Sequence, residues 1–275
     1  MIDSARTTWD SAARPPRPIE ELGELWRGRS LVAALVSRNV KVRYKRSALG
    51  VAWSMLSPAG TMLVLSLVFS HVFSASAPAY PAYLFPGLLL WMFFAQSTGS
   101  VAAEVAGGID LWRRVRLPKT APALATVLTG LVNLGFALVP LGALLLVLRR
   151  PVGAALLAAP VVLAAATAFT FGVSLLVSAA ALHFPDASDL YGILLQAWMY
   201  LTPVLYPVSI LPPRLRTAMA WNPMALYVDA FRRPFYENAA PDAATLAGAL
   251  GLGLATAAAG WIVFTRHADE VPYRG

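Results

Sequence analysis

Long uncharged stretches alternate with short polar segments along the chain after residue 50. Six of the stretches are close to or beyond the roughly 20 apolar residues that a helix needs to cross a bilayer. They cover residues 51–73, 83–103, 121–148, 152–182, 189–206 and 243–265. The pattern therefore predicts an all-α polytopic integral membrane protein, with one six-span domain over residues 51–265.

The fifth stretch is interrupted by Pro203 and Pro207. Proline removes a backbone donor and breaks a helix, and irregular backbone is not tolerated where it faces lipid. We expect residues 203–240 to turn back into the outer leaflet as a re-entrant region before the last helix, or to pack against protein there.

The segment before the first stretch is polar and divides into a tail over residues 1–19 and an expected amphipathic helix over residues 20–50. Apolar and cationic residues of that helix recur at helical spacing on roughly opposite faces, which is typical of a helix at the membrane interface. The apolar positions are Val32, Leu35, Val36 and Val40, and the cationic positions are Arg38, Lys41 and Lys45.

Composition agrees with a membrane protein. Of 275 residues, 58% are hydrophobic and 13% are charged, and the mean hydropathy is +0.62, whereas soluble domains carry about 25% charged residues. The absence of cysteine excludes disulfides and thiol chemistry. We attribute the net charge of +8 to membrane topology and contacts with anionic membrane lipids, and we expect no nucleic-acid partner.

The distribution of Lys and Arg predicts the orientation, because cytoplasmic loops carry an excess of these residues. With the N-terminus and the tail at 266–275 in the cytoplasm, sixteen of the 22 Lys and Arg lie inside and six lie outside. A bacterial inner membrane is the expected location.

The chemistry of an enzyme is missing from the sequence. No lysine follows a glycine as a phosphate-binding loop requires, so the chain cannot be its own ATPase, and the three histidines lack the spacing of metal ligands. Asp186 and Asp189 could chelate a cation or act as an acid–base pair. They are also typical of the first turn of a helix, where carboxylates complement the helix dipole, and we favour that interpretation.

Four segments of the chain resemble, in the same order, the membrane subunits of ABC exporters for polysaccharides, the class that covers O-antigen, capsule and teichoic-acid export. The segments are RYKRSALGVAWSMLSP at 43–58, GLLLWMFF at 87–94, VRLPK at 115–119, and TPVLYP at 202–207 with WNP at 221–223. One departure is Pro185 before Asp186, where members of the family often have arginine.

The resemblance implies a homodimer that pairs with two copies of a separate ATPase. ATP and Mg would bind to that partner, so no cofactor is expected in this chain. The N-terminal helix and the first inner loop would dock the ATPase, although ordinary positive-inside anchoring also explains their cations. The implied coupling residues are Arg38, Lys41, Lys45, Leu111, Trp112 and Pro118.

The resemblance also implies a substrate, a glycan linked to polyprenyl diphosphate. Guanidinium groups suit a doubly phosphorylated head, although docking of the ATPase makes equal demands on the same cations. The candidate head-group residues are Arg43, Arg113, Arg114 and Arg116.

Aromatic rings near spans two and five could stack against sugars in a glycan channel, although for each ring taken alone we favour a position in the interfacial belt or the core. The candidates are Trp91, Phe94, Tyr191, Trp198 and Tyr206, and the residues assigned to a re-entrant gate are Pro203, Pro207, Asn222 and Pro223. Asp229 and Arg233, four residues apart, would pair on a helix there.

The expected function is the permease subunit of an exporter of lipid-linked polysaccharide, driven by a separate ATPase subunit. One alternative is an ABC permease for efflux of drugs or lipids. A membrane-embedded enzyme of glycan assembly is an alternative of a different class, and it would need acidic or histidine clusters at a membrane face. Asp186 and Asp189 alone qualify.

Overall fold

The chain is helical wherever its structure is described. The computed structural model describes residues 17–45, 49–73, 79–107, 118–151, 153–184 and 186–267, and these contain helices, turns and loops but no strand. The all-α class that the hydrophobic pattern predicts is therefore confirmed for the described part of the chain.

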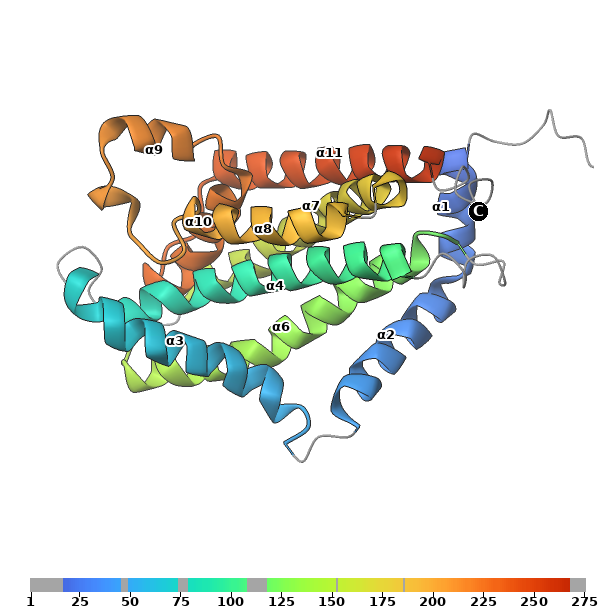
Figure 1. Ribbon diagram of the computed structural model, residues 1–275. Helices are drawn as coiled ribbons and strands as arrows, with labels where there is room; N and C mark the ends of the chain where they lie inside the picture. Colours follow the sequence, from blue (N-terminus) through green and yellow to red (C-terminus); the bar gives the residue numbers. More distant parts are fainter. Residues whose placement is uncertain are drawn as a thin grey trace, which may run out of the picture.

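Long apolar helices run side by side along one axis of the molecule (Figure 1). They are α3 (Ala52–Phe73), α4 (Tyr80–Gly107), α6 (Ala121–Val147), α7 (Ala159–His183) and α11 (Ala243–His267). Among the described residues, these five have the length and hydropathy of membrane spans, with the short η2 (Ala154–Ala158) leading into α7. The chain is thus a polytopic membrane protein.

The fifth expected span differs from the prediction. Helix α8 (Ala187–Tyr200) has 14 residues, which is about 21 Å at 1.5 Å per residue, whereas the hydrocarbon core is about 30 Å thick. The chain then forms η3 (Val208–Ile210), α9 (Pro213–Met219) and α10 (Pro223–Tyr236). Helix α10 packs against α4, α7 and α11, so protein surrounds much of it.

The N-terminal segment forms two helices where one was expected. Helix α1 (Arg17–Arg27) and helix α2 (Arg29–Tyr44) meet at Gly28, which lies beside Pro118, since a Cβ on Gly28 would be 3.8 Å from Pro118 Cγ. Val32 on the apolar face of α2 is buried against Ala121 and Ala125 of α6. That apolar face is therefore covered by protein.

Glycines bring helices α7 and α11 into close contact. A Cβ on Gly172 would collide with the backbone of Thr256, and a Cβ on Gly253 would lie 2.5 Å from the carbonyl oxygen of Ala165. Small residues allow this approach of two backbones inside a membrane. The pair forms one side of the bundle.

Helix α1 crosses one end of the bundle and is fixed to two of the long helices (Figure 1). The Glu21 carboxylate accepts hydrogen bonds of 2.9 Å from both the backbone N–H and the hydroxyl of Thr120, just before α6. The Trp261 indole N–H of α11 donates to the Pro18 carbonyl at 3.0 Å. We call this the α1 end, and the opposite end, which carries α9, the α9 end.

Candidate functional site

The break after α8 leaves a run of backbone carbonyls that no longer continue the helix. We call residues 200–206 the carbonyl segment. Buried carbonyls need donors, because an unpaired one costs about 1–3 kcal/mol. Side chains from α4 and α10 supply most of these donors, and they fix the chain at the point where the fifth span stops.

Arg232 of α10 is the central donor. Its side chain is almost completely buried, and its Nη2 donates to the carbonyls of Pro203 at 2.8 Å and Val204 at 3.3 Å. Nη1 donates to the Tyr83 hydroxyl at 2.8 Å, and the guanidinium carbon lies 3.8 Å from the centroid of the same ring. A Cβ on Gly87 would lie 2.6 Å from Nη2, so glycine at that position makes room for the cation.

Two tyrosines of α4 hold the end of the carbonyl segment. The Tyr80 hydroxyl donates to the Leu205 carbonyl at 2.6 Å, and the Tyr83 hydroxyl donates to the Tyr206 carbonyl at 2.9 Å. The Tyr206 hydroxyl itself turns back and donates to the Tyr200 carbonyl at 2.9 Å. The break is therefore bonded to α4 along several consecutive residues.

Asn222 joins the end of α8 to the start of α10. Its Oδ1 accepts from the Met224 backbone N–H at 3.0 Å, which caps α10, and from the Trp198 indole N–H at 2.9 Å. Its Nδ2 donates to the Leu201 carbonyl at 2.9 Å and to the Thr202 hydroxyl at 3.1 Å. With the 2.7 Å bond from Val204 N–H to the Thr202 carbonyl, all seven carbonyls of the segment have a donor.

The structure brings most of the predicted gate residues to this region. Pro203 offers its carbonyl to Arg232, Asn222 caps α10, and Pro223 is the first residue of that helix. Pro207 directly precedes η3. Sequence reasoning missed the role of Arg232, although a cation in the second half of α10, after a largely apolar first half, was an available signal.

An ion pair extends the same region toward the surface. Arg233 contacts Asp229 at 2.8 Å, four residues earlier on α10, so the predicted pair is confirmed. Arg233 also lies 3.7 Å from Asp242. Hydrogen bonds from the backbone N–H and hydroxyl of Thr245, with the smaller influence of Arg233, lower the pKa of the Asp242 carboxyl.

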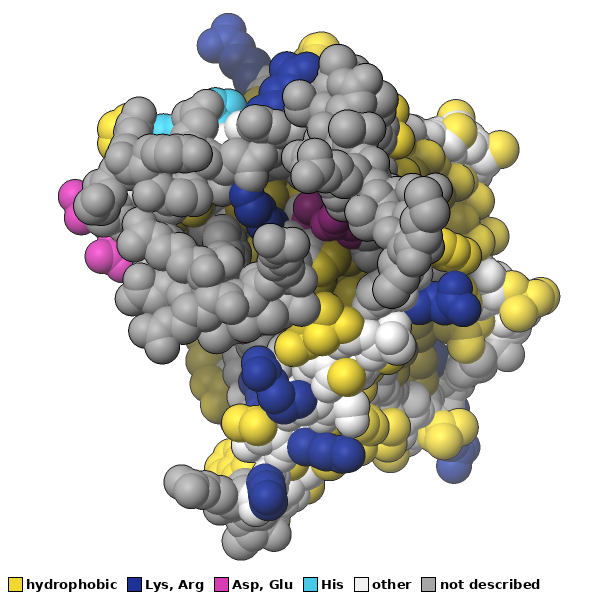
Figure 2. Space-filling view, turned by 90° about the vertical axis from the view of Figure 1, so that its right-hand side faces the viewer, with side chains coloured by type: hydrophobic (Ala, Val, Ile, Leu, Met, Phe, Trp, Pro, Cys, Tyr) yellow, Lys and Arg dark blue, Asp and Glu magenta, His cyan; other side chains and the backbone are white. Residues whose placement is uncertain are grey.

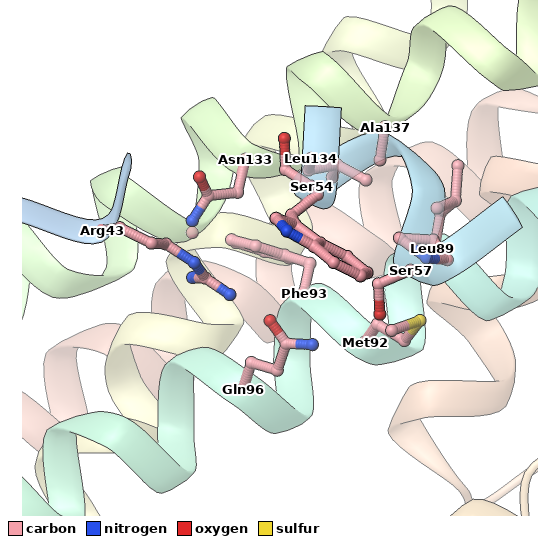
Figure 3. Close-up of a pocket in the computed structure, with 13 residues that line it drawn as sticks. Arg43, Ser54, Ser57, Leu89, Met92, Phe93, Gln96, Asn133, Leu134 and Ala137 are labelled. Atoms are coloured by element: carbon pink, nitrogen blue, oxygen red, sulfur yellow. The ribbon is translucent and has the colours of Figure 1, made fainter. Parts of the chain in front are cut away.

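A second site lies nearer the α1 end, between α2, α3, α4 and α6. Two adjoining cavities of about 170 Å³ and 490 Å³ share Arg43, Gln96, Gly130 and Asn133 in their walls. We call the two together the α2 groove. Figure 3 shows the Arg43 side chain reaching between Asn133 and Gln96 in the smaller cavity.

The polar groups of the α2 groove are only partly satisfied by the protein. The Tyr44 hydroxyl donates to Asn133 Oδ1 at 2.6 Å, and the Thr126 hydroxyl donates to Glu104 Oε2 at 2.8 Å. The Ser97 hydroxyl is buried and has no hydrogen-bond partner in the described structure. The groove thus differs from the carbonyl segment, where each acceptor has its donor.

The predicted coupling cations lie in the C-terminal half of α2 and at its C-cap. Figure 2, a view from the side of α1, shows several Lys and Arg side chains in the lower part of this face. Arg38, Lys41 and Lys45 are exposed, and Arg38 also lines the larger cavity of the α2 groove. Pro118 is buried beside Gly28. Five further candidates lie outside the described residues, namely Leu111, Trp112, Arg113, Arg114 and Arg116.

The predicted channel aromatics lie mainly inside the subunit. Trp91 and Phe94 are buried and meet Trp198 edge-on, with ring centroids 6.3 Å and 5.2 Å apart. Tyr191 is buried and donates to the Thr98 hydroxyl at 2.8 Å, and Tyr206 is half-buried in the carbonyl segment. In this structure Trp91, Phe94 and Tyr191 therefore fill the core.

The two carboxylates considered for chelation lie at a helix start. Asp186 is the N-cap residue of α8, and Asp189 is in its first turn. His183 and His267 make a ring contact with centroids 5.2 Å apart at the α1 end. Among the described residues, no group of three acidic or histidine side chains could hold a metal ion.

Comparisons with known proteins point to one class. A model of the ABC-2 type transporter family matches residues 30–236. The O-antigen export system permease protein RfbA of Myxococcus xanthus is 32% identical over 253 residues, which cover 90% of this chain and 96% of that protein. RfbA of Klebsiella pneumoniae is 26% identical over 76% of the chain and 81% of its own length. The polysialic acid transport protein KpsM of Escherichia coli is 24% identical over 73% of the chain and 79% of its own length.

Proposed function

Because the chain belongs to the ABC-2 type transporter family, we propose that it is the membrane-spanning subunit of an exporter of lipid-linked polysaccharide. The observation that carries the proposal is the 32% identity to an O-antigen export permease over nine-tenths of the chain. The chain would supply the pathway, and a separate ATPase subunit would supply the energy. The presence of a second relative named for polysialic acid transport supports glycan export in general.

The proposed location is the bacterial inner membrane, with both termini in the cytoplasm and the α9 end outside. The six arginines on the outer side weaken the charge count for this orientation. Contacts within the protein account for several of them. Arg232 is buried, Arg233 pairs with Asp229, and Arg150 lies 5.2 Å from the centroid of the Tyr236 ring. Arginines that contact other residues of the protein are weaker indicators of topology than arginines that do not.

The short α8 and the helix α10 would together take the place of a sixth span. In this proposal α8 enters from the inside and stops within the membrane, and α9 and α10 form the re-entrant region of the outer leaflet. The carbonyl segment supports the assignment, because each of its carbonyls has a donor within the protein, a backbone N–H for Thr202 and side chains for the others. Irregular backbone is tolerated at depth in a membrane under that condition.

The ATPase would dock at the α1 end, on α1, α2 and the loop that ends at Pro118. Two contacts support a joint action of these elements. Glu21 of α1 binds both the N–H and the hydroxyl of Thr120, and Gly28 lies beside Pro118. A displacement of the loop would therefore be passed to α1, and through the Trp261 bond to α11.

A second copy of the chain would complete the glycan pathway, with α3 and α8 facing its partner. Both helices leave large apolar side chains exposed, including Leu63 and Leu67 of α3 and Ile193 and Leu194 of α8. Trp53 and Tyr200 are exposed on the same two helices. They offer rings for stacking against sugars that the buried Trp91 and Phe94 do not offer in this state.

The proposal is tested by the ATPase activity of the whole complex in lipid vesicles. The chain is purified with its partner ATPase, and polyprenyl-diphosphate-linked glycan or hydrophobic drugs are added in separate samples. We expect the glycan lipid to stimulate hydrolysis and the drugs to have no effect. Stimulation by drugs alone would instead place the chain among efflux permeases, and failure of any ATPase to co-purify would argue against the assembly.

A further inference from the structure

The α2 groove is an open, partly polar space between the cationic helix α2 and the apolar helices α3, α4 and α6. Its larger cavity is lined by hydroxyl, amide and charged side chains, and its smaller cavity is lined largely by apolar ones. The polar lining comprises Arg38, Asn39, Arg43, Gln96, Ser97, Ser100, Glu104, Thr126, Thr129 and Asn133. Side chains of this kind are expensive inside a membrane and mark functional sites.

Arg43, Gln96 and Asn133 line both cavities, and the Ser97 hydroxyl lies against Gly130, which also lines both. Among the described residues, the exposed Arg43 guanidinium has no hydrogen bond or ion pair, and the buried Ser97 hydroxyl has no partner. Because Asn133 Oδ1 accepts from Tyr44, the Asn133 amide nitrogen is left to face the cavity, as Figure 3 shows. Gln96 adds a second amide on the opposite wall.

Such a set of donors fits the oxygens of a phosphate group. A guanidinium binds phosphate through two parallel N–H bonds, and amide and hydroxyl groups can occupy the remaining oxygens. The one carboxylate of the lining, Glu104, accepts from Thr126. The cation that interacts electrostatically with the Glu104 carboxylate is Arg38. Arg43, in contrast, lines both cavities.

The lining of the smaller cavity indicates a second property of the ligand. Beyond Arg43 its walls are formed by Trp53 and Pro58 of α3, Met92 and Phe93 of α4, and Leu134 of α6. A molecule that fills both cavities therefore carries a phosphate at one end and an apolar chain at the other. This excludes free phosphate and nucleotides as good occupants and favours a phosphorylated lipid.

We propose that the α2 groove binds the phosphate head of a lipid, with Arg43, Gln96, Ser97 and Asn133 as the contacting residues. Two sources share this chemistry, a polyprenyl diphosphate and an anionic phospholipid. The first source rests on the proposed export function, where the groove would receive the substrate from the inner leaflet. Binding of the head itself does not rest on that function.

Binding is measured on the complex with its ATPase in nanodiscs of zwitterionic lipid. The two probes are polyprenyl diphosphate and phosphatidylglycerol. We expect Arg43→Gln to weaken binding of the preferred probe at least about tenfold, since a charge-assisted bidentate contact is lost. Arg43→Lys should give a smaller loss, because it keeps the charge but not the fork. Arg29→Gln is the matched control, since Arg29 is exposed on α2 and does not line the groove.

Each outcome is decisive for the groove. Loss of binding in Arg43→Gln with retention in Arg29→Gln supports it, and the probe that competes at lower concentration identifies the source. Equal binding by wild type and Arg43→Gln overturns it. If the glycan lipid still stimulates hydrolysis in that case, the export function stands without the groove. If hydrolysis never responds to glycan lipid but a probe binds through Arg43, the groove stands and the export function fails.

Discussion

Two arginines of this chain, Arg232 and Arg43, differ in whether the protein itself binds their guanidinium groups. Arg232 is buried in α10, and its Nη1 and Nη2 donate to Tyr83 and to the carbonyls of Pro203 and Val204, whereas its Nε has no partner in the described structure. Arg43 is exposed at the α2 groove, whose lining also contains the Ser97 hydroxyl without a partner in the described structure. A cation whose terminal nitrogens are bonded to the protein holds the fold, whereas a cation that makes no hydrogen bond or ion pair to the described residues is available to a ligand.

The contrast has a physical cause in the backbone. The carbonyl segment exposes acceptors because two prolines end the helix there, and the fold must supply donors to keep the break inside the bundle. No helix is broken where α4 and α6 line the groove. The polar side chains there are therefore not needed to repair the backbone.

The strongest test of the comparison is Arg232→Met, which keeps much of the apolar stem and removes the charge. The carbonyls of Pro203 and Val204 would lose their donor inside the protein. We expect a loss of about 3 kcal/mol in the free energy of unfolding, measured by denaturation in detergent micelles. Arg214→Met is the control, because Arg214 is exposed on α9. If the free energy of unfolding of Arg232→Met equals that of the wild type, water must hydrogen-bond to the two carbonyls in place of the guanidinium.

Asn222→Ala is expected to have the next largest effect. It removes the cap of α10 together with the bonds to Trp198 and the Leu201 carbonyl. Loss of a cap costs about 1 kcal/mol, and loss of the other bonds brings the expected total to about 2 kcal/mol. The same denaturation experiment measures it. Asn222→Asp keeps an acceptor for the Met224 and Trp198 N–H groups and loses the bonds that Nδ2 donates. It should therefore recover part of the loss, and an equal loss in both variants would contradict the role of the cap.

Tyr83→Phe tests the contribution of a single hydroxyl to the carbonyl segment. The substitution removes the hydroxyl that donates to the Tyr206 carbonyl and accepts from Arg232, while the ring under the guanidinium stays. We expect a loss of about 1–2 kcal/mol. Tyr200→Phe is the control, because Tyr200 is exposed. A larger loss than in Arg232→Met would place the main contribution on the tyrosine and not on the cation.

These two regions also mark how far the sequence predicts the structure. Uncharged stretches located the five helices of spanning length that the described residues contain, and the prolines located the interruption of the fifth stretch. The position of the break at Tyr200 depends on Arg232, Tyr80 and Tyr83. Their partners lie more than 25 residues away in the chain, and hydrophobic periodicity carries no such information.

The groove and the N-terminal helices illustrate the same limit. Arg43 was a predicted head-group residue, but Gln96, Ser97 and Asn133 gain their place only from the packing of α2, α4 and α6. The division into α1 and α2 was missed because Gly28 is tolerated inside helices in general. Its neighbour Pro118 lies 90 positions later. The sequence allows Trp91, Phe94 and Tyr191 either in a channel or in the core, and the packing places them in the core of the subunit.

Asp229→Asn removes one partner of the ion pair with Arg233 on α10. Both side chains are partly exposed, at 45% and 33%. We expect a loss of about 0.5 kcal/mol or less at low salt, and a smaller one in high salt because the pair is screened. Denaturation at two salt concentrations measures it. A loss that does not depend on salt would mean that the pair acts as part of the buried core around Arg232.

The smallest expected effect on stability is that of Arg43→Met, the same substitution as at Arg232. Arg43 is exposed, and among the described residues no acceptor would lose its donor. Substitutions at such positions usually change the free energy of unfolding by about 0.5 kcal/mol or less. The measurement is again denaturation in micelles, made without added polyprenyl lipid so that no bound head group contributes. Addition of polyprenyl diphosphate should then stabilise the wild type and not the variant, since a ligand stabilises only the form that binds it. If Arg43→Met instead unfolds as easily as Arg232→Met, both arginines hold the fold, and the groove loses its claim to a ligand.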